Sequence, residues 1–314
     1  MTVEPAPEEP DASDHRGGDE AESVELQERD IEADAYARFD CTSDDAARTA
    51  EAVDTARRAV EAGDCIVLPT DTVYGIGADA FSPDAVQGLL DAKDRGRDMP
   101  PPVLVGDASL VRALATDVPD QARELVEVHW PGPLTIVCRI QPSLRMDLGD
   151  TDGTIALRVP DHPLAREILR RTGPLAVSSA NLSGRPAALT CDEAVDQLGD
   201  RVAVYLDGGP LGTQVDGAAR HALPSTIVDF TRHDDGQLLR RGALSLETLR
   251  QVLPGLRDLD EPPAEAPVPV EPSVEPTVET PVAPLAPTEA PAVAAVAAAP
   301  PQPDEPRIEP EPAA

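Results

Sequence analysis

The sequence is poor in aromatic residues and in cysteine, and it has no long apolar run. Aromatic residues make up 2% of the 314 residues, and the four cysteines form no CxxC pair and have no histidine at a zinc-ligand spacing. We therefore expect reduced, mostly buried thiols and neither a disulfide framework nor a zinc site. The most apolar stretch near the C-terminus, 290–299, has about half of the ~20 residues that a membrane span needs. The N-terminus lacks the basic start and apolar run of a secretory signal. These absences predict a soluble, cytoplasmic protein without a membrane segment.

Basic residues are also scarce, and the acidic excess lies mainly at the two ends. The net charge is −32; residues 1–35 carry thirteen acidic and two basic residues, and residues 258–314 carry twelve acidic and one basic residue. The 222 residues from 36 to 257 therefore keep a net charge of only −10. That length can bury one sizeable core, and its negative charge argues against the broad basic face that grips nucleic acid.

Both acidic ends have the composition of disordered segments. Residues 1–35 contain too little apolar surface to offset the entropy cost of ordering, and residues 258–314 contain sixteen of the 35 prolines. We therefore expect one folded domain, 36–257, between a disordered acidic arm, 1–35, and an extended proline-rich tail, 258–314. Composition favours a tail that only keeps the protein soluble, and a low-affinity docking tail stays the alternative.

Within the central region, short apolar segments alternate with amphipathic ones. The predicted strands span 65–68, 103–105, 134–140, 155–159, 175–178, 202–206, 226–230 and 238–240. The predicted helices run from a cap at Ser43 to Gly63, from a cap at Ser82 to Lys93, and over 109–115, 120–129, 163–171, 192–198 and 245–253. This alternation predicts an α/β domain with a mixed, twisted open sheet flanked by helices.

Polar loops follow the apolar segments that end at Leu68, Val177 and Leu239, and open α/β sheets bind ligands at such loops. The first loop, 69–77, offers two threonine hydroxyls, a carboxylate and a phenol, together with glycines that permit close backbone approach. The alternative is a turn whose hydroxyls cap the local backbone. The glycine pair is no dinucleotide-binding fingerprint, because the third glycine is missing.

A cluster of three cations, Lys93, Arg95 and Arg97, follows the second predicted helix. Arginine presents a planar fork to phosphate oxygens and lysine a point charge, so the cluster is a candidate phosphate clamp. The alternative is a solvated helix end, where cations complement the helix dipole. We expect Lys93 to be exposed, so that Lys93→Ala would lower activity by orders of magnitude and leave the fold intact.

The loop 178–184 combines serines, an amide and a glycine at the end of an apolar strand. Serines and successive backbone N–H groups in such a turn form an anion-binding nest without adding charge. A Ser-His-Asp hydrolase is the competing interpretation, but the chain has no G-x-S-x-G elbow, and none of its five histidines stands in a catalytic context. We therefore expect anion binding rather than nucleophilic catalysis.

Seven segments, taken in order, resemble the YrdC-like family, which comprises the L-threonylcarbamoyladenylate synthases. They are PTDTVYGIGADAF at 69–81, AKDRGRDMP at 92–100, WPGPLTIV at 130–137, IALRVPDHP at 155–163, SSANLSGRPA at 178–187, PSTIVDF at 224–230 and LLRRGA at 238–243. The resemblance covers about Phe39 to Leu253, and the ordered set is highly specific. Longer members append a second domain after a linker; here the proline-rich tail takes that place, so the chain resembles the short, single-domain form.

The resemblance implies a twisted open sheet with a large concave, positive cavity, and it implies a nucleotidyl transfer. In that reaction L-threonine, bicarbonate and ATP, with Mg2+ on the triphosphate, give L-threonylcarbamoyl-AMP and pyrophosphate. The implied partners are these substrates and the downstream tRNA threonylcarbamoyltransferase complex, and a weak contact to tRNA itself stays open.

The same resemblance assigns roles to eleven residues. Lys93 and Arg95 match the family's Lys-x-Arg pair, and Ser179 and Asn181 match its Ser-x-Asn pair; both pairs are associated with ATP. Lys93 and Arg95 would also be catalytic, by stabilising charge on the phosphoryl oxygens. The other implied ATP contacts are Arg97, Thr154, Ser178 and Arg240, and the implied threonine contacts are Thr70, Arg158 and Ser225. No protein ligand for a metal is implied.

One of these assignments has an alternative in the sequence itself, and two positions depart from the family's usual pattern. Arg158 suits a bidentate grip on the amino-acid carboxylate, and a surface ion pair with the nearby Asp161 is the competing interpretation. Many relatives carry a lysine where Met99 stands and a histidine where Leu104 stands, so one phosphate-binding charge would be lost here.

Two other functions stay open from the sequence. One is an RNA-binding module of the same fold, for double-stranded RNA or tRNA, without synthase activity; its binding would weaken steeply with salt. The other is a paralogue that uses a different carbamoyl donor.

Overall fold

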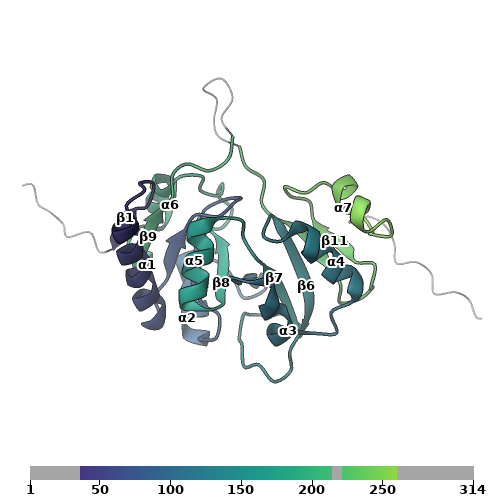
Figure 1. Cartoon of the computed structure of the whole chain (residues 1–314). Helices are drawn as coiled ribbons and strands as arrows, with labels where there is room; N and C mark the ends of the chain where they lie inside the picture. Colours follow the sequence, from purple (N-terminus) through teal and green to yellow (C-terminus); the bar gives the residue numbers. More distant parts are fainter. Residues whose placement is uncertain (1–35, 214–220, 260–314) are drawn as a thin grey trace, which may run out of the picture. The chain divides into compact units, whose positions relative to one another are not determined.

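The computed structural model describes residues 36–213 and 221–259 (Figure 1). The predicted folded domain lies within these ranges, apart from residues 214–220. The predicted acidic arm, and the proline-rich tail from residue 260 onward, lie outside the described residues. Within the described ranges, no helix is long and apolar enough to cross a membrane.

The described residues form one mixed sheet, in the spatial order β1-β9-β2-β3-β8-β4-β7-β6-β10-β11, with β5 paired to β6. The pairs β1/β9, β9/β2, β4/β7 and β6/β10 are parallel, and the other pairs are antiparallel. The strands are β1 Ala37–Asp40, β2 Ile66–Leu68, β3 Gly75–Asp79, β4 Val103–Leu104, β5 Ala115–Thr116, β6 Leu134–Ile140, β7 Thr154–Arg158, β8 Leu175–Ser179, β9 Val204–Asp207, β10 Thr226–Asp229 and β11 Gln237–Arg240. The predicted fold class, a mixed open sheet flanked by helices, is confirmed.

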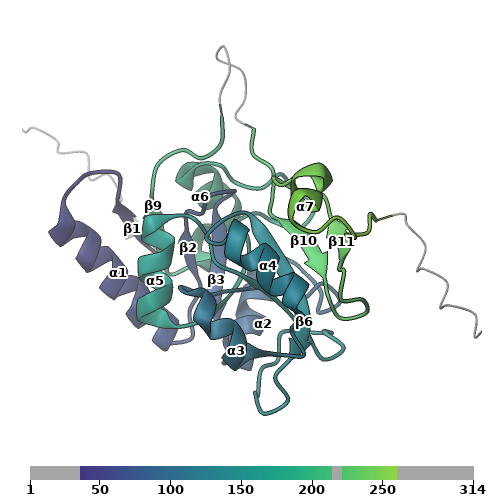
Figure 2. The ribbon, with the colours of Figure 1, turned by 45° about the vertical axis from the view of Figure 1, so that its right-hand side comes forward.

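Seven α-helices flank this sheet in the described part of the chain (Figure 2). They are α1 Ala46–Glu61, α2 Pro83–Ala92, α3 Val111–Leu114, α4 Asp120–His129, α5 Pro163–Thr172, α6 Cys191–Leu198 and α7 Leu246–Val252. Two short 3-10 turns, Ala108–Leu110 and Gly199–Arg201, precede α3 and follow α6.

One half of the sheet is covered on both faces. Successive side chains of a strand point to opposite faces, and in β2 Ile66 and Leu68 belong to one apolar cluster while Val67 belongs to another. The first cluster contains the buried sides of α1 and α5, and the second contains those of α2 and α6. Both faces of β2 are therefore covered by apolar side chains of the flanking helices.

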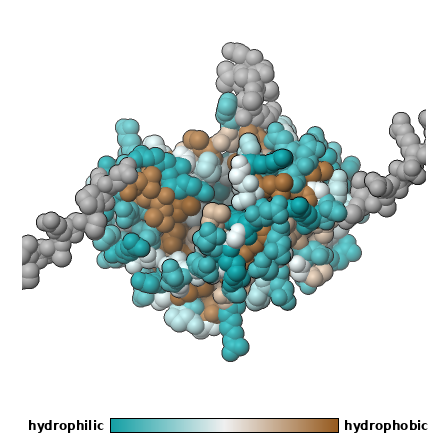
Figure 3. Space-filling model, turned by 180° about the vertical axis from the view of Figure 1, so that it is seen from behind, coloured by the Kyte–Doolittle hydropathy of each residue, from teal (hydrophilic) through white to brown (hydrophobic). Residues whose placement is uncertain are grey.

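The other half of the sheet is covered by helices on one face only. In β6, Leu134, Ile136 and Cys138 pack into a core with α3, α4 and α7, whereas Thr135 and Val137 point the other way. The opposite face borders a cavity instead of a helix. Viewed from behind, the surface shows apolar patches among mostly hydrophilic residues (Figure 3).

Several predicted boundaries were wrong, for local reasons. The first helix is capped by Asp45 rather than Ser43, because the Asp45 carboxylate accepts hydrogen bonds from the N–H groups of Ala47 and Arg48. The predicted helix 109–115 is a 3-10 turn and one α-helical turn that runs into β5. The strand β3 was not predicted, since two of its five residues are glycine.

Other expectations about local structure are met. Cys65, Cys138 and Cys191 are buried and Cys41 is half-buried, which confirms that the cysteines are mostly buried. Gly75 at the start of β3 has a packing reason, because a Cβ there would lie 2.7 Å from Val177 Cγ1 on β8. The close approach of β3 to β8 therefore requires glycine at this position.

Candidate active site

A cavity of about 680 Å³ opens on the uncovered face of the sheet. Nine of the eleven predicted site residues line it, namely Thr70, Arg95, Thr154, Arg158, Ser178, Ser179, Asn181, Ser225 and Arg240. Its lining includes four arginines and no aspartate or glutamate. In a chain with a net charge of −32, this lining is an exceptional concentration of positive charge. Such a cavity is suited to an anionic ligand.

Arg95 reaches the cavity from the turn that ends α2. Asp94 has a left-handed backbone conformation, with φ 52°, which turns the chain away from the helix axis. The Arg95 Nη1 donates to Ser178 Oγ at 2.8 Å, while its Nε is buried and has no partner among the described residues. Burial lowers the pKa of Arg95. An anion in the cavity would give the buried N–H a partner and offset the lost hydration.

Lys93 is buried, not exposed as expected, and it does not line the cavity. Its side chain is 2% exposed, and Nζ donates to the carbonyl oxygen of Asn181 at 2.6 Å and to that of Ser179. Burial, with a smaller contribution from Arg95, lowers the pKa of Lys93 to about 8. The Lys93 carbonyl also accepts from the Ser183 N–H at 2.9 Å. Lys93 thus fastens the serine-rich loop to the end of α2.

Arg97 lies outside the cavity lining. Its side chain is 42% exposed and forms an ion pair with Asp147. This position fits the alternative that cations at this helix end are solvated. Met99 is also exposed and away from the cavity lining, whereas Leu104 is buried in the cavity wall. The three cations of the cluster thus lie in three different environments.

The loop after β8 is held by its own amide side chain. Asn181 Nδ2 donates to the carbonyl oxygens of Leu182 and Arg185, both at 2.8 Å. These bonds close the loop and leave Ser178, Ser179 and Arg185 along the cavity wall. The Asn181 amide group is therefore used to shape the loop.

The threonines of the first loop stabilise their own turn. Thr70 Oγ1 donates to the Val73 carbonyl at 2.6 Å and accepts from the Thr72 N–H at 3.2 Å. The alternative of hydroxyls that cap the local backbone is therefore correct for Thr70. Both threonines are nevertheless on the cavity wall, so the turn presents them to a ligand.

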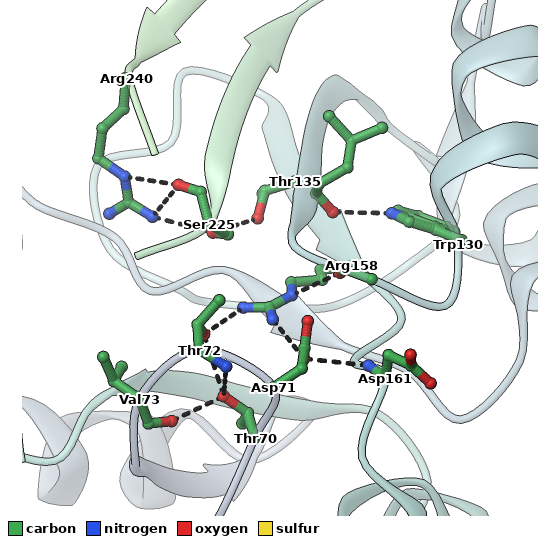
Figure 4. A network of polar contacts seen from close by, with 12 residues as sticks. Thr70, Asp71, Thr72, Val73, Trp130, Thr135, Arg158, Asp161, Ser225 and Arg240 are labelled. Atoms are coloured by element: carbon green, nitrogen blue, oxygen red, sulfur yellow. Dashed lines mark hydrogen bonds and ion pairs between the residues drawn. The ribbon is translucent and has the colours of Figure 1, made fainter. Parts of the chain in front are cut away.

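Arg158 lies at the centre of a polar network in this wall (Figure 4). Its Nε donates to the Gly132 carbonyl at 3.0 Å, Nη1 to Thr72 Oγ1 at 3.1 Å, and Nη2 to Asp71 Oδ1 at 2.5 Å. Arg158 is 5% exposed, so the alternative of a surface ion pair with Asp161 is wrong; Asp161 contributes a backbone N–H to Asp71. Burial lowers the pKa of Arg158, and the neighbouring Asp71 raises it.

Ser225 connects Arg240 to the strand β6. Arg240 Nη2 donates to Ser225 Oγ at 2.9 Å, and Ser225 Oγ lies 2.8 Å from Thr135 Oγ1, close enough to share a hydrogen bond (Figure 4). Burial is the main cause that lowers the pKa of Arg240, and the charges of Arg158 and Arg95 lower it further. The cavity cations thus repel one another, and a bound anion would relieve that repulsion.

Four further residues of the site were not identified from the sequence: Asp71, Thr72, Thr135 and Arg185. Asp71 and Thr72 belong to the loop that drew attention, and Arg185 to the segment SSANLSGRPA, but the sequence does not show which side chains face the cavity. Thr135 carried a usable signal. It is a lone hydroxyl between Leu134 and Ile136 in an apolar strand.

No group of three or more His, Cys, Asp or Glu side chains in the described ranges could hold a metal ion. The cavity lining offers hydroxyl groups and cations, and these fit a metal that arrives on a polyphosphate better than one held by protein carboxylates.

Comparison with known proteins identifies the family of this chain. The Sua5/YciO/YrdC family, described as telomere recombination, matches residues 58–242. The chain belongs to this family. A putative threonylcarbamoyl-AMP synthase of Mycobacterium tuberculosis is 49% identical over 215 residues, which are 68% of this chain and 94% of the relative. The threonylcarbamoyl-AMP synthase of Bacillus subtilis is 36% identical over 230 residues, 70% of this chain and 62% of the relative.

Solved structures of family members share the fold. P. abyssi Sua5 complexed with L-threonine has a TM-score of 0.62 and 28% identity, covering 71% of this chain and 62% of that chain. E. coli YciO has a TM-score of 0.58 and 22% identity, covering 68% of this chain and 98% of that chain, which speaks for the fold alone. The predicted family resemblance is confirmed.

Proposed function

We propose that this chain is a threonylcarbamoyl-AMP synthase, which converts L-threonine, bicarbonate and ATP into L-threonylcarbamoyl-AMP and pyrophosphate. The observation that carries the proposal is the cavity lined by Arg95, Arg158, Arg185 and Arg240 without a carboxylate. Relatives named putative threonylcarbamoyl-AMP synthase match this chain over nearly their whole length, and they support the same activity. The cavity is also large enough for a nucleotide and an amino acid together.

The reaction needs positioning and charge stabilisation rather than a side-chain nucleophile. The threonine amine attacks the carbon of bicarbonate or CO2 and forms a carbamate, with loss of water or of a proton. A carbamate oxygen then attacks the α-phosphorus of ATP in line, and the bond to the β-phosphate oxygen breaks to release pyrophosphate. Negative charge accumulates on the phosphoryl oxygens during this step.

Separate parts of the cavity wall would serve the two substrates. The unpartnered Arg95 Nε, with Ser178 and the neighbouring Thr154, would contact the polyphosphate, and Arg240 would add charge beside it. Arg158 would hold the threonine carboxylate, with Thr70 and Ser225 next to it. Buried Lys93 would act by shaping the loop of Ser179 and Asn181 and by its charge. Mg2+ would enter on the triphosphate as part of the substrate.

The product would pass to a tRNA-modifying partner complex in the cytoplasm. No feature of the described surface favours an RNA-binding module over the enzyme. The four cavity arginines gather around one cavity and do not form a broad basic face.

A pyrophosphate-release assay tests the proposed function. The full-length protein with ATP and Mg2+ should release pyrophosphate only when threonine and bicarbonate are both present, and mass spectrometry should detect the adenylate. Serine in place of threonine, and carbamoyl phosphate in place of bicarbonate, distinguish the paralogue with another carbamoyl donor. Pyrophosphate release that is indifferent to threonine would contradict the proposal.

A further inference from the structure

The strongest unexplained group beside the cavity is the carboxylate of Asp71. Its side chain is 13% exposed and forms the ion pair with Arg158, yet Asp71 does not itself line the cavity. Oδ1 accepts two hydrogen bonds, from Arg158 Nη2 at 2.5 Å and from the Asp161 N–H at 3.0 Å. Oδ2 is buried without a partner in the described part of the chain.

This arrangement is poorly explained by stability. A buried ion pair recovers its desolvation cost only when the remaining lone pairs are also satisfied, and one carboxylate oxygen here is not. An apolar residue pair of similar volume would avoid that cost. A functional reason for keeping a charged residue at this position is therefore needed.

The ion pair fixes the direction of the Arg158 guanidinium. Three of its five N–H groups donate to three separate acceptors, which are Gly132, Thr72 and Asp71. Two N–H groups keep no partner among the described residues, and Arg158 lines the cavity. Figure 4 shows the guanidinium between the loop of Thr70–Val73 and the Ser225–Thr135 pair. The Asp161 contact also ties Asp71 to the segment just before α5.

We propose that Asp71 is a positioning residue that presents Arg158 to the carboxylate of the amino-acid substrate. This inference rests on the proposed function and adds a residue that no other observation assigns to it. Asp71 sets the orientation before the substrate arrives, so less ordering is needed on binding. Its effect is therefore confined to substrates that carry a carboxylate next to the reacting amine.

The test compares Asp71→Ala and Asp71→Asn in the full-length protein, with L-threonine and with L-threoninol, which lacks the carboxylate. Asp71→Ala should lower kcat/KM for threonine about 10- to 100-fold, the effect of losing a charged hydrogen bond. The preference for threonine over L-threoninol should fall by at least about tenfold, while KM for ATP stays within about twofold. Asp71→Asn keeps an oxygen acceptor and should restore part of the preference.

Asp229→Asn is the matched control, because Asp229 is an aspartate of low exposure that lies outside the cavity lining, and in the described part of the chain it accepts only a local N–H bond from Thr231. It should leave the preference unchanged. Equal losses with threonine and L-threoninol, or a parallel rise in KM for ATP, would show a merely structural role and overturn the inference. So would unchanged kinetics in both Asp71 variants.

The two proposals fail in different ways. Wild-type protein without threonine-dependent pyrophosphate release would contradict the proposed function itself. Wild-type turnover combined with an unchanged preference in the Asp71 variants would contradict only the role of Asp71. If Asp71→Ala fails to fold, Asp71→Asn must still show a reduced preference, and an unchanged one overturns the inference.

Discussion

Two hollows of this protein contain arginines, and these arginines have different kinds of partner. The groove between α1 and α5, of about 470 Å³, pairs its arginines with acids: Arg57 with Asp54 at 2.9 Å and Arg171 with Glu167 at 3.1 Å. In the cavity, Arg95 and Arg240 instead donate to serine and carbonyl oxygens. The arginines of the groove are paired with acids, whereas Arg95 and Arg240 of the cavity form no ion pair among the described residues.

The difference shows what distinguishes an anion site from a charged surface. Exposed ion pairs are worth about 0–1 kcal/mol and leave little charge for a ligand. The cations of the cavity repel one another, since the charges of Arg158 and Arg95 add to the lowering of the Arg240 pKa. The folded protein keeps this unfavourable arrangement, which an anionic substrate would relieve. Three changes test whether the contrast is real.

The largest effect is expected from Arg95→Ala. This change removes the buried Nε that lacks a partner and the contact to Ser178, so kcat/KM for ATP should fall about 10²- to 10³-fold, as for loss of one charge-stabilising donor. Steady-state pyrophosphate release measures it. Arg97→Ala, two residues along the chain but exposed and paired with Asp147, is the control and should change kcat/KM by less than about threefold. Equal losses in both variants would remove the distinction between the cavity and its surroundings.

An intermediate effect is expected from Lys93→Met, which keeps the length of the side chain and removes its donors. The carbonyls of Ser179 and Asn181 then lose a buried partner, so the free energy of unfolding should fall by about 1–3 kcal/mol. Activity should fall about 10- to 100-fold, because the loop and a nearby positive charge are both affected. Thermal or urea denaturation and the pyrophosphate assay measure the two quantities.

The role of Lys93 can also be tested by the pH dependence of stability and of ATP affinity, compared between the wild type and Lys93→Met. Its pKa is about 8 in the folded protein and 10.5 in an exposed lysine, so between these values the unfolded chain binds more protons. The Lys93 contribution to stability should therefore rise with pH in that window, while ATP affinity falls by up to about tenfold per pH unit. Lys93→Met should lose both trends. Identical pH profiles in wild type and variant would contradict this role.

The smallest effect is expected in the groove. Arg57→Ala removes its exposed pairs with Asp54 and Glu61 and should change the free energy of unfolding by less than about 1 kcal/mol. Pyrophosphate release should be unchanged. A loss of activity comparable to that of Arg95→Ala would mean that the groove takes part in function and that charge balance does not separate the two hollows.

The fold class followed from sequence patterns because those patterns are local. The alternation of apolar residues in β6 and the cap of α2 by Ser82 depend on neighbours in the chain. The strand β3 escaped prediction because its glycines are explained only by contact with Val177 on β8. Local propensity has no access to such a contact.

Prediction of the site was partial for the same reason. The resemblance to a family singled out the cations at positions 93, 95 and 97. Their identical charge does not show which of these side chains is buried. The structure places Lys93 inside, Arg95 in the cavity wall and Arg97 outside. Sequence reasoning offered Asp161 as the partner of Arg158 because it is nearby in the chain, whereas the actual partner is Asp71.

By itself, the sequence determined the alternation of strands and helices, the acidic ends and the ordered motifs of the family, since each of these is written in neighbouring residues. Only the tertiary structure decided which charges meet. Asp71 and Arg158 are 87 positions apart, and Arg95 and Ser178 are 83 apart. Such pairs form because the sheet order places β3, β8, β4 and β7 side by side, and pairing of distant strands depends on the packing of the whole domain.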